Sequence, residues 1–250
     1  MTFARRLIDL NIRLSQATAR LLNLPTDKVL WERFQQATED QLRRLPDGGT
    51  LVDLGAGRRC IYAGALRSSL EFVAIDVSGD ELALNDHADV RIVANASEQI
   101  PLPNASVGLL VSRAVLEHVP DLAAAVREMA RVIQPGGHTI HLFPCRYSLF
   151  AIVARTLPFK PVVSLLHRVV PSTIDQVEFE VFYDRGWPAE VERTFRAAGF
   201  RDVAVELTWA QPGYFEPVYP LFLVYSLYEF VVRRARVRRL AAYMLVHAER

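Results

Sequence analysis

An acidic residue and two glycines follow one another at the end of a short apolar run. Residues 51–57 read as a strand that carries Asp53 and passes into a turn with Gly55 and Gly57. Because glycine has no Cβ, the backbone can bend sharply there and let a ligand approach closely. A carboxylate at this point suits a cationic ligand and would repel a pyrophosphate. The dinucleotide fingerprint also requires a third glycine, where this chain has Cys60, so a nicotinamide or flavin site is disfavoured.

The elements that must position this turn follow in a regular series. Residues 71–76 form a second apolar run that ends in Asp76, about 20 residues beyond the glycines, where a ribose-binding carboxylate is expected. A helix over residues 122–133 should end at the stop signal Pro135-Gly136-Gly137. Further strands are predicted over residues 90–96, 106–112, 138–143, 203–209 and 241–247.

Taken together, these motifs resemble the class I methyltransferases that use S-adenosylmethionine (SAM), and among them the small-molecule group that includes the ubiquinone-biosynthesis type. The resemblance is close over residues 50–144 and holds only in outline elsewhere. It implies an α/β fold with a Rossmann-like, seven-stranded, mostly parallel sheet, helices on both faces and an antiparallel last strand. The motifs that carry it are Val52–Gly57, Ala74–Asp76, Asn95-Ala96 with Pro101–Pro103, Val115–Val119 and Arg131–Gly137.

The resemblance implies SAM as the cofactor and no metal. It places Asp53, Gly55 and Gly57 at the methionine side of the cofactor and Asp76 at the ribose. Three departures from the family pattern stand out: Arg59 replaces a glycine, Asn95 replaces the usual aspartate, and the fourth strand ends in Ser112-Arg113. The full set of predicted cofactor-binding residues is Asp53, Gly55, Ala56, Gly57, Asp76, Val77, Asn95, Ala96, Ser112 and Arg113.

A hydroxyl acceptor would need a base, because alcohols are barely ionised near neutral pH. His118 lies just past the fourth strand, where this fold gathers its active site, and Glu117 is expected to cap or orient it. A purely structural role for His118 at a helix start stays equally open. Arg113 is a candidate for holding an acceptor oxygen or the cofactor carboxylate, and its structural alternative is an ion pair with Glu117 at helical spacing.

The methyl acceptor is predicted from the aromatic and acidic segment around residue 183. Aromatic faces with polar edges suit sugar rings, so a saccharide hydroxyl is the first hypothesis, and core packing is the alternative for Trp187. A lipid or quinone-like hydroxyl is the second hypothesis, and a non-catalytic binding protein with the cofactor fold is the rival from another class. The predicted acceptor residues are Tyr183, Asp184, Trp187 and Tyr214.

Composition describes one globular domain. The 250 residues are 51% hydrophobic and 23% charged, which is enough for a sizeable core. A net charge of +1 gives no field that would favour nucleic acid. Two distant cysteines suit a reduced compartment, and the N-terminus lacks the apolar core of a signal peptide, so a cytoplasmic monomer or homodimer is expected.

The residues outside the motifs read as additions that cover the site. Residues 1–47 should form two helices, 48–144 the cofactor-binding core, and 145–186 and 210–239 insertions over the substrate, with helices at 148–156 and 162–169. Within the second insertion, residues 217–232 are strongly apolar and arginines follow. The favoured interpretation is a helix over the sheet edge with a solvated basic end. Peripheral contact of residues 217–239 with anionic lipid, an anionic acceptor or a dimer contact are the alternatives.

Overall fold

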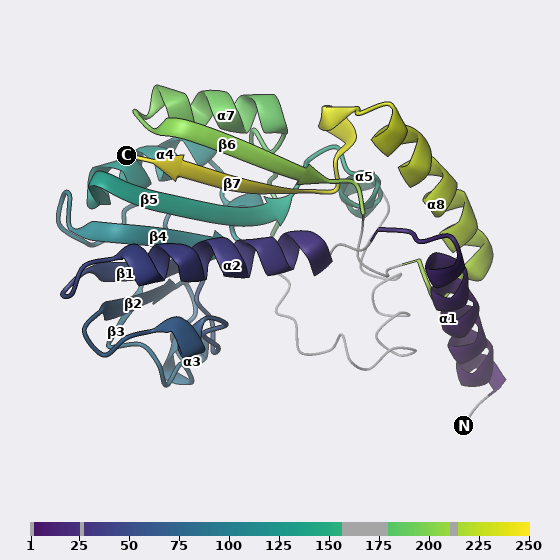
Figure 1. Cartoon of the computed structure of the whole chain (residues 1–250), viewed down its shortest axis with the longest axis horizontal. Coiled ribbons are helices and arrows are strands. Elements are labelled where there is room, and N and C mark those ends of the chain that lie inside the picture. Colours follow the sequence, from purple (N-terminus) through teal and green to yellow (C-terminus); the bar gives the residue numbers. More distant parts are fainter. Residues whose placement is uncertain (1–2, 26–27, 157–179, 211–214) are drawn as a thin grey trace.

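The computed structural model describes residues 3–25, 28–156, 180–210 and 215–250, and it is built on one seven-stranded sheet. The strand order is β3-β2-β1-β4-β5-β7-β6 (Figure 1). Only β7 runs against its neighbours, so the predicted mostly parallel sheet with an antiparallel last strand is confirmed. The strands are β1 Thr50–Leu54, β2 Glu71–Asp76, β3 Val90–Val93, β4 Val107–Arg113, β5 Ile133–Pro144, β6 Arg201–Thr208 and β7 Tyr243–Glu249.

The central strands are apolar along their length because both faces of the sheet are covered. Leu51, Leu54, Leu109 and Leu110 in β1 and β4 are fully buried, as expected for parallel strands with helices on both sides. The sheet order reverses between β1 and β4, since β2 follows β1 on one side and β4 lies on the other. Ligands of such sheets bind at the carboxyl ends of the strands beside this reversal.

Helices pack on both faces, as predicted. On one face, α4 and α7 bury Met129 and Phe195 against the sheet. On the other, α2 buries Phe34 and Leu42, and α3 adds Leu82. The helices are α1 Phe3–Leu21, α2 Lys28–Arg44, α3 Gly79–Ala83, α4 Leu122–Val132, α5 Leu149–Thr156, α7 Pro188–Ala197 and α8 Tyr219–Arg234, with 3₁₀ turns at Ala63–Ala65, Leu116–His118 and Arg238–Leu240.

Several boundaries differ from the prediction. Strand β5 begins at Ile133 rather than His138, because the predicted Pro-Gly stop is a bulge within the strand: pairing with β4 shifts there, and Gly136 has a φ of +78°. Strand β3 ends at Val93, and the short helix α3 was not predicted. The predicted helix over 162–169 lies outside the described residues.

The apolar helix near the C-terminus differs most from its favoured interpretation. Helix α8 packs against α1 at the end of the molecule beyond the strands, instead of covering the sheet edge (Figure 1). Its link to the core is made by Trp209 Nε1, which donates to the carbonyl of Val237, and by the Tyr225 hydroxyl, which donates to the carbonyl of Trp209. Among the described helices, none is long and apolar enough to cross a bilayer.

Candidate active site

The glycine turn after β1 is hydrogen-bonded to the end of β2. Gly55 and Gly57 have φ values of +68° and +51°, which glycine adopts without steric cost. The backbone N–H of Gly57 donates to Asp76 Oδ2 at 2.9 Å, and Ser78 N donates to Asp76 Oδ1 at 2.9 Å. The buried side chain of Asn85 donates to the Gly57 carbonyl at 3.2 Å. The acid at the end of β2 therefore holds the turn from which a ligand would be bound.

Asp53 lies beside this turn at the buried end of β1. Burial raises the pKa of the Asp53 carboxyl to about 7, although the Tyr62 hydroxyl donates to it and Arg113 is near. The Arg113 guanidinium lies over the Trp31 ring, 5.2 Å from its centroid. Arg113 ends β4 and Glu117 belongs to a 3₁₀ turn, so the two are not at the helical spacing that the structural alternative assumed.

Asp53 and Arg113 face one pocket beside the glycine turn. It is open to solvent and is lined by Phe34, Asp53, Gly55, Arg59, Tyr62 and Arg113, among others. Sequence reasoning missed Trp31, Phe34 and Tyr62. The two residues of α2 fit an apolar helix pattern that indicates core packing, and Tyr62 follows the turn in a loop without any pattern. No local signal identified these three.

Glu117 and His118 form a compact pair in the 3₁₀ turn after β4. The Glu117 side chain is buried, Oε2 has no hydrogen-bond partner within the described structure, and burial raises its pKa to about 8. His118 Nδ1 lies 2.9 Å from the carbonyl oxygen of Glu180, and Nε2 lies 3.8 Å from Glu117 Oε1. Because a carbonyl only accepts, Nδ1 carries the hydrogen and Nε2 the lone pair of the neutral ring.

Among the predicted acceptor residues, Tyr183 lies next to this pair, and the three that the structure describes all have structural contacts. Tyr183 is 3% exposed, and its backbone N–H donates to the Glu117 carbonyl at 3.0 Å. Asp184 Oδ2 accepts from the N–H of Leu122 at the start of α4. Trp187 directly precedes α7, and its ring packs near the ring of Tyr147, with centroids 5.8 Å apart. Tyr214 lies outside the described residues.

The remaining predicted cofactor residues are spread along the strand ends. Ala56 is buried, Val77 is 53% exposed beside Asp76, and Ala96 packs partly on the core. Asn95 accepts from Ser97 in a local turn. The Ser112 hydroxyl bonds His141 Nδ1 at 2.7 Å in the core, where burial lowers the pKa of His141 to about 3. The Ser112 and His141 side chains therefore belong to one buried network in the core.

The residues around the turn fit the chemistry of SAM. Its amino-acid tail carries an ammonium and a carboxylate, and the pocket presents an acid and a guanidinium, Asp53 and Arg113. Asp76 stands where a ribose carboxylate belongs, and the exposed Val77 offers an apolar contact for a base. Within the described residues, no group of three or more His, Cys, Asp or Glu side chains could hold a metal ion.

Comparisons with known proteins agree with this fit. Residues 52–141 match the family model described as a methyltransferase domain. Demethylmenaquinone methyltransferase of Mycolicibacterium vanbaalenii is 31% identical over 193 residues, which are 74% of this chain and 81% of that protein. An uncharacterized methyltransferase of Mycobacterium sp. (strain KMS) is 32% identical over 114 residues, 45% of this chain and 44% of that protein.

Solved structures share the fold at low sequence identity. Phosphoethanolamine N-methyltransferase 2 of Haemonchus contortus, in complex with SAM, has a TM-score of 0.53 and 16% identity, over 88% of this chain and 52% of that one. Geranyl diphosphate methyltransferase, in complex with GPP and sinefungin, has a TM-score of 0.52 and 19% identity, over 86% and 77%. This chain thus spans about half the length of some of its relatives. With the matched family model and the mycobacterial relatives, the chain belongs to the class I SAM-dependent methyltransferase family.

Proposed function

We propose that this protein transfers the methyl group of SAM to a hydroxyl-bearing, quinone-like acceptor of apolar character. The observation that carries the proposal is the Glu117–His118 pair after β4, which combines a buried carboxyl of raised pKa with an imidazole held in one tautomer. Relatives at about 30% identity that carry the name demethylmenaquinone methyltransferase support the acceptor class.

His118 is proposed as the base. Its Nδ1–H donates to the Glu180 carbonyl, so the Nε2 lone pair is the one that takes the acceptor's proton. In its ionised form the Glu117 carboxyl, 3.8 Å from Nε2, stabilises the imidazolium; because burial raises its pKa to about 8, this contribution grows as the pH rises. When bound, SAM supplies an electrophilic methyl group on a sulfonium that leaves as a neutral thioether. The deprotonated acceptor attacks in line, so the new bond to the methyl carbon forms as the sulfur–carbon bond breaks.

The contacts of the predicted acceptor residues favour the quinone-like acceptor over the saccharide. Tyr183 is almost fully buried, and the Asp184 carboxylate caps the start of α4. A sugar would need these groups for stacking and for hydroxyl binding. The Trp187 side chain lies beside Tyr147 and Arg239 and remains partly exposed to solvent. This exposed surface could stack on a sugar ring, so a saccharide hydroxyl is the second candidate.

For the cofactor, Asp53 and Arg113 are proposed to hold the methionine tail, with the backbone of Gly55, Ala56 and Gly57 against it. Asp76 is proposed for the ribose hydroxyls. Val77, Asn95 and Ala96 are proposed for the adenine. Each oxygen of Asp76 already accepts one backbone N–H and keeps a second lone pair for a ligand.

SAM affinity should fall as the solution becomes acidic, because Asp53 must lose its proton to face the ammonium. In the free protein the raised pKa of about 7 leaves Asp53 largely protonated below that value. The bound ammonium favours the carboxylate, so the dissociation constant should rise roughly tenfold between about pH 7.5 and about pH 6. Titration calorimetry at both pH values measures it. Asp53→Asn keeps an oxygen for the Tyr62 hydroxyl and should show no such slope; equal slopes in both proteins would exclude Asp53.

Turnover on matched acceptor panels tests the acceptor. One panel holds reduced quinones and hydroxylated lipids, and the other holds mono- and oligosaccharides, with S-adenosylhomocysteine release as the common readout. We expect turnover on quinols only, and product NMR then shows whether oxygen or the neighbouring ring carbon of the phenolate receives the methyl group. Turnover confined to sugars would replace this proposal by the second candidate. Turnover on neither panel, with SAM bound, would reject both.

A further inference from the structure

Exposed apolar side chains gather at one end of the molecule. More than half of the large apolar side chains that are exposed in the described structure belong to α1, α8 and their adjoining residues. On α1, Leu7, Leu10, Leu14 and Leu21 follow helical spacing and are 41–85% exposed. A helix that served only to pack on its own protein would turn this stripe inward.

Polar contacts, together with the half-buried Ile8 and Ile12, hold the inward side of α1 against the α8 region. Ser15 is fully buried, and its hydroxyl donates to the Glu216 carbonyl at 3.1 Å. Thr18 Oγ1 and the Tyr219 hydroxyl are 2.9 Å apart, and Asn11 Oδ1 accepts from the N–H of Tyr219. These contacts fix the rotation of α1 against α8, so the leucine stripe must face away from the protein.

Helix α8 repeats this arrangement with an even larger apolar surface. Its buried side consists of Tyr225, Glu229 and Val232. Its outer side carries Val224 at 67%, Leu227 at 65% and Val231 at 54% exposure, one and two helical turns apart. The adjoining Leu223 and Phe230 are exposed as well. Two neighbouring helices of one chain thus both expose their apolar side.

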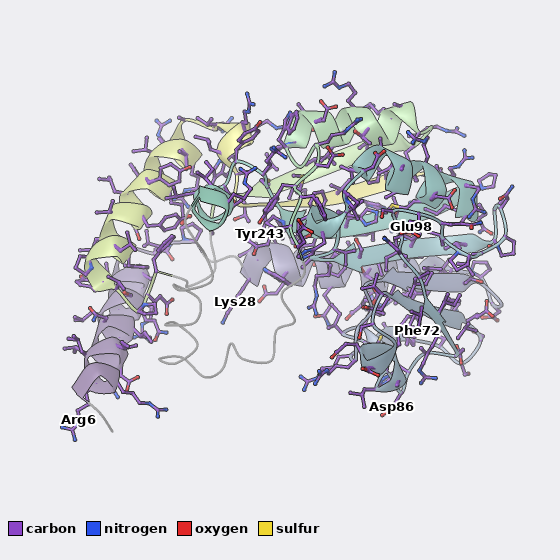
Figure 2. The ribbon with its side chains drawn as sticks, turned by 180° about the vertical axis from the view of Figure 1, so that it is seen from behind. Arg6, Lys28, Phe72, Asp86, Glu98 and Tyr243 are labelled. Carbon is purple, nitrogen blue, oxygen red and sulfur yellow. The ribbon has the colours of Figure 1, made fainter. Side chains whose placement is uncertain are left out.

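Arginines border these apolar surfaces. Helix α1 carries four arginines against one aspartate, and the exposed Arg6, Arg13 and Arg20 recur every seven residues along the side of the leucine stripe. Arg6 lies at the outer tip of α1 (Figure 2). At the other end, α8 runs into Arg233, Arg234 and Arg236. A basic border around an apolar face is the composition of helices that lie in the headgroup region of anionic bilayers.

The position of this end also suits such a surface. The parallel strands point toward the end of the molecule where α1 and α8 lie (Figure 1). The glycine turn, Asp76 and the Glu117–His118 turn all follow the carboxyl ends of these strands. Helices α1 and α8 therefore lie at the same end of the molecule as the candidate site.

We propose that the outer faces of α1 and α8 dock this protein on the surface of an anionic lipid membrane. A second copy of the chain is the competing occupant, but an isologous dimer through these faces would bring the arginine borders together. Anionic headgroups neutralise the same arginines. The docking is peripheral, since none of the described helices can span a bilayer. The inference goes beyond the proposed transfer reaction and needs no acceptor to test.

Flotation with vesicles tests the docking. The full chain should float with vesicles of phosphatidylcholine and about one-third phosphatidylglycerol, and it should bind pure phosphatidylcholine much less. Leu14→Glu with Leu227→Glu should lower binding at least tenfold, because both place a charge on the outer faces. Arg13→Glu with Arg20→Glu should lower it roughly fivefold or more for each arginine, with strong salt dependence. Both pairs lie on exposed positions, so circular dichroism should be unchanged.

Matched controls place the same changes elsewhere. Leu84→Glu replaces an exposed leucine near α3, and Arg127→Glu replaces an exposed arginine on α4; both should float like the wild type. Equal flotation with neutral and anionic vesicles, or no flotation, overturns the proposal. The faces belong to a second copy instead if the wild type binds no vesicles and sedimentation shows a concentration-dependent dimer that Leu14→Glu abolishes. SAM binding and turnover of a water-soluble quinol should not change in any variant, which separates this result from a failure of the proposed function.

Discussion

Replacing His118 with asparagine should lower kcat by about 10²- to 10⁴-fold on a hydroxyl acceptor, the usual contribution of a positioned general base. Asparagine can still donate its side-chain N–H to the Glu180 carbonyl, as Nδ1 does now. It has no basic nitrogen to take the acceptor's proton. The loop would therefore keep its anchor while the chemistry loses its base.

Two further measurements separate catalysis from positioning. SAM affinity should stay within about twofold of the wild type, because His118 lies outside the pocket beside the glycine turn. The rate of the variant should rise with pH, since a phenolic hydroxyl that ionises in solution near pH 10 no longer needs the base. His87→Asn, in a surface turn, is the matched control. A His118→Asn enzyme that keeps wild-type kcat at neutral pH would leave His118 with a structural role only.

The fold could be read from the sequence because its signals are local. Each buried parallel strand is a short apolar run, and β1 and β2 carry an acid at or next to their last residue, at a characteristic separation. Boundaries were harder where a tertiary contact overrides a local signal. Pro135-Gly136-Gly137 reads as a stop, yet pairing with β4 and β7 carries the strand through it as a bulge. Pairing across a sheet is not visible in a single stretch of sequence.

The site divides in the same way. The position of Glu117 and His118 near the carboxyl end of β4 could be predicted, because they follow that strand within a few residues. For Tyr183 and Asp184, no local pattern indicates that one is buried and that the other caps α4 from 62 residues away. The outward orientation of the α1 leucine stripe was equally hidden. A helical pattern shows that an apolar face exists, and only the polar contacts of Ser15 and Thr18 with the α8 region show where it points.

Replacing Gly55 with alanine should destabilise the fold and disturb both halves of the site. At φ +68° an L-residue is strained, and a Cβ there would lie 2.2 Å from Val115 Cγ2. Val115 begins the turn that carries Glu117 and His118, so relief of the clash must move that turn or the glycine loop. Left-handed strain of about 1–2 kcal/mol and overpacking of about 1–3 kcal/mol predict a total loss of roughly 2–5 kcal/mol. Urea unfolding of the ligand-free protein measures the free energy of unfolding.

Gly57→Ala is the matched control, because its φ of +51° imposes similar strain while no atom lies within 4 Å of the added Cβ. It should cost only the strain, about 1–2 kcal/mol. Val115→Ala removes the clashing methyl, so a double-mutant cycle should return part of the stability lost by Gly55→Ala, with a coupling of at least about 1 kcal/mol. If the two alanine variants lose equal stability and the cycle shows no coupling, the glycine turn and the 3₁₀ turn of Glu117 and His118 are independent. A measured coupling would mean that Gly55 is required not only for a ligand to approach the backbone but also for the position of the turn that carries Glu117 and His118.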